Sequence, residues 1–130
     1  MADLAAGAEI PEVRVTPDRY LTVRYAGASG DFNPIHIDDE FARGVGLPGK
    51  ILHGLWTMAQ VARAHTEAVG RPDALRRLSV QFRGMGLIGE EIVVTGTAAE
   101  ADGDVVVVHS EASQAGRRII RHAEAELHLG

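Results

Sequence analysis

The feature that most constrains the fold is a change of hydrophobic period in the second half of the chain. Residues 54–69 are apolar with helical spacing, and Gly70 followed by Pro72 ends the helix that this spacing predicts. From residue 77 onward apolar and polar residues mainly alternate, which is typical of strands with one buried face. One buried helix beside several such strands indicates an α+β fold in which the helix covers one face of a sheet.

Five strands are expected in an antiparallel sheet. One strand precedes the long helix, and four follow it as a meander in which consecutive strands pair. Asp102-Gly103 is a good hairpin pair for the turn over residues 101–104. The expected strands cover residues 10–15, 77–83, 91–100, 105–113 and about 122–129.

Shorter elements are expected between the first strand and the long helix. Thr16 is a suitable N-cap for a helix that begins at the next residue, a proline, and buries Tyr20 and Val23. Residues 31–37 are expected to be irregular, because Asn33-Pro34 resists continuing a helix.

Composition restricts the class of protein. The 130 residues suit a single domain, 1–130, since a split into two would leave each half short of a core. The net charge of −5 argues against a nucleic-acid binder, and no apolar run reaches the ~18 residues that a membrane-spanning helix needs. The chain has no cysteine, and Met1–Pro11 lacks a secretory pattern, so we expect a cytoplasmic protein.

Several sequence motifs match in part, but the residues around them do not fit the site that each motif would predict. Gly44–Gly49 and Gly84–Gly89 match the dinucleotide glycine pattern, but neither opens a helix directly after a strand. A calcium loop starting at Asp31 would need an oxygen ligand at Ile35 and a glycine at His36. The histidines lack zinc-type spacing, and no serine nucleophile elbow is present. These motifs therefore predict no metal site.

The segment 29–38 is the most informative in the chain. It places Asp31 and His36 five residues apart on a backbone that Gly30 and Pro34 bend sharply, so both side chains can turn toward one point. Asp31 is a candidate base for a water molecule, His36 is of the side-chain type that titrates closest to neutral pH, and Asn33 suits the turn. A purely structural role, with Asp31 and Asn33 accepting from loop amides and His36 at the surface, is the alternative.

A second element favours the catalytic interpretation. The residues Ile51-Leu52-His53-Gly54 lead into the long helix, so the Gly54 amide lies at a helix N-terminus, where partial positive charge collects. A glycine there lets a carbonyl oxygen approach the backbone closely, as in an oxyanion site that stabilises an enolate formed from a thioester.

The two motifs together resemble the MaoC-like hydratase/dehydratase family. The resemblance rests on Gly30-Asp31-x-Asn33-Pro34-x-His36-x-Asp38 followed by Ile51-x-His53-Gly54, and the order of helix and strands extends it over nearly the whole chain. The family includes R-specific enoyl-CoA hydratases and mycobacterial hydroxyacyl-ACP dehydratase subunits. It implies a single hot-dog fold, an antiparallel five-stranded sheet wrapped around a long central helix.

The resemblance also implies a reaction, the reversible hydration of trans-2-enoyl thioesters to R-3-hydroxyacyl thioesters. Asp31 and His36 would activate the water, and the Gly54 amide would polarise the thioester carbonyl. Coenzyme A (CoA) or acyl carrier protein (ACP) would be part of the substrate, with no metal or redox cofactor. The residues expected to bind substrate or support the loop are Ser29, Asn33, His53 and Trp56.

The sequence departs from the family pattern at two places. The loop at residues 83–90 lacks the usual proline and ends in Glu90 instead of aspartate, and Leu55 replaces a methionine. Trp56 could line or shorten an acyl pocket, but a core position is the favoured interpretation. Two groups of arginines could meet substrate phosphates, although solvated strand faces are the favoured interpretation for both: Arg76, Arg77 and Arg83, and Arg117, Arg118 and Arg121.

Two alternative functions remain open, a non-catalytic acyl-binding or stabilising subunit of a heterodimeric dehydratase, and a hot-dog thioesterase. Exposed sheet edges and a half-covered helix predict a homodimer, with a heterodimer of two hot-dog subunits as the alternative. Acyl chain length, the choice between CoA and ACP, the pathway and the role of three glycines at 84, 86 and 89 do not follow from the sequence.

Overall fold

The computed structural model describes residues 4–130; Met1, Ala2 and Asp3, which begin the N-terminal segment considered above, lie outside the described residues. Five strands form one antiparallel sheet in the order β1-β3-β4-β5-β2. The strands are β1 (Val13–Val15), β2 (Leu75–Phe82), β3 (Ile92–Asp102), β4 (Val105–Gln114) and β5 (Arg117–His128).

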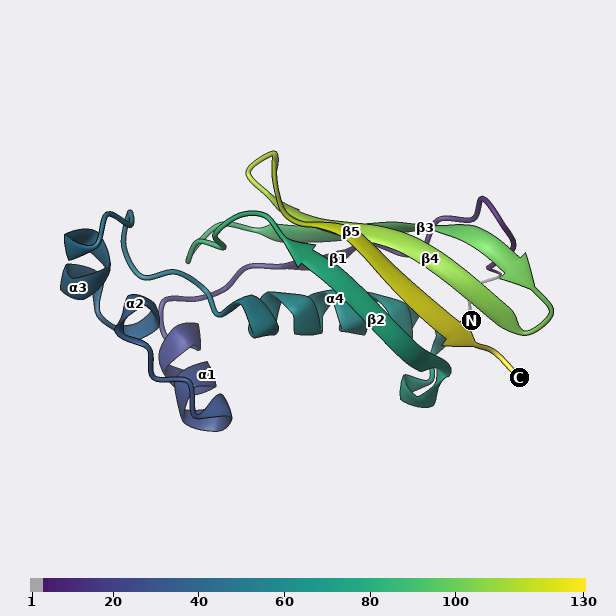
Figure 1. The fold of residues 1–130 in the computed structure, drawn as a ribbon, viewed down its shortest axis with the longest axis horizontal. Coiled ribbons are helices and arrows are strands. Elements are labelled where there is room, and N and C mark those ends of the chain that lie inside the picture. The colour runs from purple at the N-terminus through teal and green to yellow at the C-terminus, as the bar shows by residue number, and fades with distance from the viewer. Residues whose placement is uncertain (1–3) are drawn as a thin grey trace.

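The long helix α4 (Gly54–Val69) lies along one face of this sheet (Figure 1). Three shorter helices gather beyond the end of the sheet where α4 begins (Figure 1). These helices are α1 (Leu21–Ser29), α2 (Pro34–Ile37) and α3 (Asp39–Gly44), and a 3₁₀ turn at Pro72–Ala74 follows α4.

The core forms between α4 and the sheet, and the expected alternation is confirmed on β4 and β5. Along β5, Ala123, Ala125 and Leu127 are buried while the residues between them are not. On α4 the buried apolar residues are spaced three or four apart, so that one helix face meets the sheet. The buried apolar residues of these two layers include Val61, Ala64, Ala68, Ile92, Val94, Val106, Val108 and Ala112.

The strand order corrects the expected meander. β2 pairs with β5 at the edge of the sheet, with Leu78 opposite Ala125, and does not pair with β3. Tight turns join only β3 to β4 and β4 to β5, and the first of them uses Gly103-Asp104, one residue later than expected. The connection from β2 to β3 is a long glycine-containing loop, so the chain crosses from one side of the sheet to the other instead of turning back.

The helix α1 begins later than the sequence predicts. Thr16 caps nothing in the structure, and α1 begins at Leu21 because Asp18 instead accepts a hydrogen bond of 2.8 Å from the Tyr20 amide. The buried residues of α1 are Thr22 and Ala26, whereas Tyr20 and Val23 are 56% and 53% exposed. The expected inner face of this helix was therefore wrong.

The helix α4 has the bounds that the sequence predicts, but only one side of it is covered. Leu55 is 64% exposed although it is one of the apolar residues of this segment. Among the described residues, no helix is both long enough and apolar enough to cross a membrane.

His65 of α4 is completely buried, and the sequence does not predict this burial for a polar residue. Its Nδ1 donates a hydrogen bond of 2.7 Å to the Val61 carbonyl one turn earlier, and its buried Nε2 has no partner among residues 4–130. Burial lowers the pKa of His65, since the charged imidazolium would lose its hydration.

This buried imidazole predicts a loss of stability in mild acid. Because the pKa of His65 is lower in the folded than in the unfolded chain, the unfolded chain binds more protons as the pH falls below about 6.5. The free energy of unfolding should therefore decrease from pH 7.5 to pH 5.5, by at most about 1.4 kcal/mol per pH unit from this group. Urea denaturation of the wild type and of His65→Leu at both pH values measures this change in the free energy of unfolding. An equally steep pH dependence in the variant would contradict the assignment.

Candidate functional site

The catalytic candidate Asp31 lies just after the end of α1. Gly30 ends this helix in the left-handed conformation, with φ of +79°, and its amide donates to the Ala26 carbonyl. The Ser29 hydroxyl accepts a hydrogen bond of 3.2 Å from the Asp31 amide. Ser29 therefore supports the loop, one of the two roles that the sequence predicts for it.

Asn33 and Pro34 organise the next turn. Asp31 Oδ1 accepts from the Asn33 amide at 3.2 Å, and Asn33 Oδ1 accepts from the Ile35 amide at 3.2 Å, which caps α2. Residues 34–37 are thus a helical turn and not irregular as expected, because proline disfavours a helix interior but suits the first helical position.

His36 turns toward Asp31 from this short helix. Its Nδ1 is 2.9 Å from the Ile51 carbonyl oxygen, which can only accept, so Nδ1 carries the proton and Nε2 presents a lone pair when the ring is neutral. Nε2 is 3.9 Å from Asp31 Oδ2, too far for a direct hydrogen bond. The His36 side chain is 10% exposed and that of Asp31 is 53% exposed, so the pair lies at the boundary between interior and solvent.

His53 joins the two catalytic candidates. It is buried, its Nε2 donates a hydrogen bond of 3.0 Å to the Asp31 carbonyl, and its ring stacks on that of His36 at 3.9 Å between centroids. Tyr25 of α1 also packs against the His53 ring, at 4.7 Å between centroids. The sequence motifs predict His53 near the site but not Tyr25, which belongs to none of them.

A cavity of about 210 Å³ opens beside His36 and Gly54. Its walls are mainly apolar, and they come from the α4 N-terminus, from the end of β2 with the loop after it, and from the start of β5. Asp31 lies outside this lining, on the more exposed side of His36. The lining residues are His36, Ile51, Leu52, Gly54, Thr57, Phe82, Gly84, Met85, Gly86, Ile119 and Ile120.

Trp56 does not line this cavity. It is partly buried and packs against the core, which is the interpretation that the sequence favoured. The residues that sequence reasoning missed are Thr57, Phe82 and Met85, which line the cavity. Phe82 was assigned only as a strand residue.

The glycines of the loop after β2 have a role that the sequence did not reveal. A Cβ on Gly86 would lie 2.7 Å from Leu52 Cδ1, closer than side-chain atoms approach. The Leu52 amide donates to the Gly86 carbonyl at 2.9 Å, and Ile51 pairs with Leu87 as an isolated bridge. This loop therefore packs directly against the segment that carries His53 and Gly54.

Gln114 at the end of β4 holds the same loop from the sheet side. Its side chain is 1% exposed, accepts from the Leu87 amide at 2.7 Å and donates to the carbonyls of Leu87 and Glu90 at 2.7 and 2.9 Å. All the hydrogen-bonding groups of this amide thus serve one loop, 24 to 27 residues away in sequence. No sequence motif marks such a long-range contact.

Asp31, His36 and His53 are the residues that come nearest to a metal site, since one ligand atom from each lies within 4.8 Å of the others. However, the two imidazole rings are stacked and inclined by only 23°, so their lone pairs lie in two nearly parallel planes about 3.9 Å apart. His36 Nδ1 and His53 Nε2 also bind backbone carbonyls. This arrangement suits stacking and backbone anchoring better than a shared ion.

The family model described as a MaoC like domain matches residues 7–116, which include the loop of Asp31, the helix α4 and four of the five strands. The chain belongs to this family. Its sequence therefore places the Asp31–His36 loop and the Gly54 helix terminus in a MaoC-like domain, as the motifs predict.

Curated relatives of this MaoC-like chain are longer proteins. The peroxisomal enoyl-CoA hydratase 2 of Arabidopsis thaliana is 38% identical over 84 residues, which are 63% of this chain and 26% of that protein. The fatty acid synthase beta subunit hexB of Dothistroma septosporum is 38% identical over 108 residues, 80% of this chain and 6% of that protein. The chain thus spans about a quarter or less of either relative.

Solved structures confirm the hot-dog fold of the MaoC-like family. A MaoC-like dehydratase matches with a TM-score of 0.93 and 30% identity, over 98% of this chain and 41% of that one. An (R)-hydratase of A. caviae involved in PHA biosynthesis matches over 100% of both chains, with a TM-score of 0.88 and 17% identity. The ChsH1-ChsH2 complex of Mycobacterium tuberculosis matches with a TM-score of 0.88 and 20% identity over 97% of this chain and 98% of that one.

Proposed function

We propose that this chain catalyses the reversible hydration of short trans-2-enoyl thioesters to R-3-hydroxyacyl thioesters. The observation that carries the proposal is the gap of 3.9 Å between Asp31 Oδ2 and His36 Nε2. Both atoms accept hydrogen bonds when His36 is neutral, so a water at about 2.8 Å from each would donate one proton to each. Its oxygen lone pairs would then face away from both groups, toward a substrate.

The Gly54 amide supplies the second part of the mechanism. As the first residue of α4 it has no intrahelical partner for its N–H, and it lines the same cavity as His36. A thioester carbonyl bound there receives a hydrogen bond that strengthens as the enolate forms. The water oxygen bonds to C3 while its proton passes to the Asp31–His36 pair, and a proton from that pair then reaches C2.

The size of the cavity supports a short acyl chain. Its volume of about 210 Å³ is below the ~300–1,000 Å³ of pockets that hold larger organic ligands. Apolar residues close it on several sides, among them Phe82, Met85 and Ile119. Crotonyl thioesters, with four acyl carbons, are therefore the first substrates to test.

The assay follows the loss of enoyl absorbance on adding crotonyl-CoA, with free thiol measured in the same reaction. We expect absorbance to fall without thiol release, and chiral analysis to give the R-3-hydroxybutyryl product. Thiol release at the rate of turnover would instead show a thioesterase. No turnover with either crotonyl-CoA or crotonyl-ACP would favour the non-catalytic subunit.

We also infer a homodimer, because the molecule leaves its edges open and an apolar surface uncovered. β1 and β2 are edge strands, and Leu55 and Phe82 beside the cavity are 64% and 51% exposed. Pairing with a second copy would cover both the open sheet edges and the exposed apolar side chains. Light scattering on the chain expressed alone tests this: a mass of two chains is expected, and a monomer that dimerises only with another hot-dog protein would show a heterodimer.

A further inference from the structure

The cationic side chains of this acidic protein fall into two groups. Within residues 4–130, one group forms ion pairs with carboxylates and so carries little free charge toward a ligand. These paired side chains are Arg14, Arg24, Arg63, Arg71, Arg77 and Arg118. The other group forms no such pair within the same residues, and three of its members, Arg19, Arg43 and Lys50, line one cavity together. The remaining members of this group are Arg76, Arg83, Arg117 and Arg121.

This cavity, which we call the cationic cavity, has a volume of about 560 Å³. Its three cations come from three segments: Arg19 precedes α1, Arg43 lies in α3, and Lys50 lies in the segment leading to α4. Two carboxylates, Asp39 and Glu90, line it as well. Asp39 Oδ1 accepts a hydrogen bond of 2.9 Å from the Lys50 amide, so it is directed at the backbone. The cationic cavity keeps a net positive charge in a chain whose net charge is −5.

Neutral groups hold two of the cations in place. The Lys50 ammonium donates to the Arg19 carbonyl at 3.4 Å, and the Arg19 guanidinium stacks on the Tyr20 ring at 4.7 Å. Neither contact neutralises charge, and each leaves N–H groups free. Guanidinium and ammonium groups arranged in this way suit the oxygens of a phosphate.

The cationic cavity adjoins the cavity lined by His36 and Gly54, which we call the reaction cavity. Lys50 immediately precedes Ile51, whose carbonyl anchors His36, and it is four residues from Gly54, a span of at most about 14 Å. Leu87 and Ile88 line the cationic cavity, and the same loop lines the reaction cavity with Met85 and Gly86. The bridge between Ile51 and Leu87 thus joins the two walls, since Ile51 lines the reaction cavity and Leu87 lines the cationic cavity.

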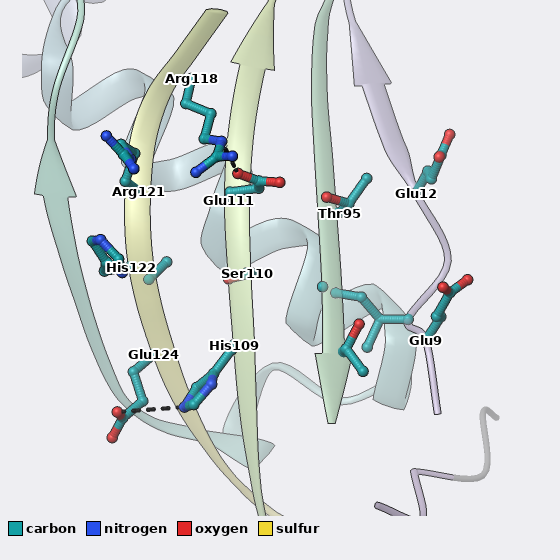
Figure 2. Close-up of a pocket in the computed structure, with 14 residues that line it drawn as sticks. Glu9, Glu12, Thr95, His109, Ser110, Glu111, Arg118, Arg121, His122 and Glu124 are labelled. Atoms are coloured by element: carbon teal, nitrogen blue, oxygen red, sulfur yellow. Dashed lines mark ion pairs between the residues drawn. The ribbon is translucent and has the colours of Figure 1, made fainter. Parts of the chain in front are cut away.

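A second cavity, of about 650 Å³, does not suit the same ligand (Figure 2). It lies on the outer face of the sheet, with a helix behind the strands (Figure 2), whereas His36 lines the cavity to which Gly54 and Thr57 of α4 contribute. Arg118 there pairs with Glu111 at 3.0 Å, and His109 faces Glu124 at 3.7 Å. Four glutamates against two arginines make this surface acidic. Arg118 and Arg121 of β5 are therefore poor candidates for phosphate binding.

We propose that Arg19, Arg43 and Lys50 form the subsite for a phosphate on the carrier arm of the thioester substrate. This rests on the proposed function, because it assigns the position of the handle whose acyl end reaches His36 and Gly54. Phosphate occurs both in CoA and in the phosphopantetheine arm of ACP, so the shared ligand chemistry is a phosphate ester joined to pantetheine.

The test compares the KM for crotonyl-CoA with that for crotonyl-pantetheine, which has no phosphate, in the wild type, Arg43→Ala and Lys50→Ala. We expect each substitution to raise the KM for crotonyl-CoA by about tenfold, with kcat unchanged, since a charge-assisted contact made equally in substrate and transition state is lost. The KM for crotonyl-pantetheine should not change. Lys50→Arg should retain the wild-type KM, and Arg118→Ala, which removes a paired cation, is the matched control.

The outcomes separate this proposal from the proposed function. A wild type that hydrates neither thioester overturns the function, whereas wild-type turnover with an unchanged KM in both variants overturns only the subsite. Equal rises in KM for crotonyl-CoA and crotonyl-pantetheine also overturn it. With crotonyl-ACP as a third substrate, a parallel rise in KM assigns the phosphate next to pantetheine, and a rise for CoA alone assigns the nucleotide phosphates.

Discussion

Replacing Asp31 with asparagine is expected to lower kcat for crotonyl-CoA hydration by about 10²–10⁴-fold, the usual contribution of a positioned acid–base group. The amide keeps an oxygen that can accept from the Asn33 amide, as Asp31 Oδ1 does at 3.2 Å, so the turn should persist. The atom facing His36 would change from an acceptor to a donor and could no longer take a proton from the shared water. Steady-state kinetics measures the loss, and an unchanged melting temperature shows that the fold is intact.

Asp38→Asn is the matched control, because Asp38 Oδ1 likewise accepts from a backbone amide, that of Phe41 at 3.1 Å, whereas the carboxylate near His36 Nε2 is that of Asp31. It should retain nearly wild-type kcat. His36→Gln should lose activity to a similar extent, and the double variant should lose no more than the worse single variant, because both groups act on one water. Turnover that survives both single substitutions would remove Asp31 and His36 from the mechanism.

Gly86→Ala is expected to reduce both stability and activity, although it adds one methyl group. That methyl would lie 2.7 Å from Leu52 Cδ1 and 3.2 Å from Leu52 Cβ, so the buried Leu52 side chain has to shift. Overpacking of this kind costs about 1–3 kcal/mol. Because Leu52 precedes His53 and Gly54, its displacement also shifts the candidate oxyanion site, and a shift of about 1 Å can lower kcat by up to about 10²-fold.

Gly84→Ala provides the comparison within the same loop, since a Cβ there meets its nearest atoms at 3.4–3.5 Å, an ordinary contact distance. Urea denaturation should show a lower midpoint with an unchanged slope for Gly86→Ala, and little change for Gly84→Ala. Shortening Leu52 to alanine in the Gly86→Ala background should cost less than the two single changes added together. Additive effects would show that the two residues do not press on each other.

The loop after β2 connects the predictions for Gly86→Ala and Arg43→Ala, because it lines both the cationic cavity and the reaction cavity. Gln114 fixes this loop through three hydrogen bonds to Leu87 and Glu90. A disturbance at Gly86 should therefore raise the KM for crotonyl-CoA as well as lower kcat. Arg43→Ala should change KM alone, because Arg43 lines the cationic cavity and is not among the residues that line the reaction cavity.

The sequence alone was sufficient for features that depend on neighbouring residues. Gly30 at the end of α1 and the turn that Asn33 stabilises act over one to five residues, and they bring Asp31 and His36 close together. The helical turn at residues 34–37 was not predicted, since this segment was expected to be irregular. The bounds of α4 likewise follow from Gly70 and from the hydrophobic period. Local hydrogen bonds and steric preferences determine these features, so residue types and spacing predict them.

Only the tertiary structure decided which distant segments meet. The pairing of β2 with β5, the complete burial of His65, the contact of Gly86 with Leu52 and the hold of Gln114 on Leu87 all depend on how the sheet closes over α4. The same holds for Arg19, Arg43 and Lys50, which no motif connects. Burial and packing between residues far apart in sequence depend on the whole chain at once, so a local sequence pattern does not predict them.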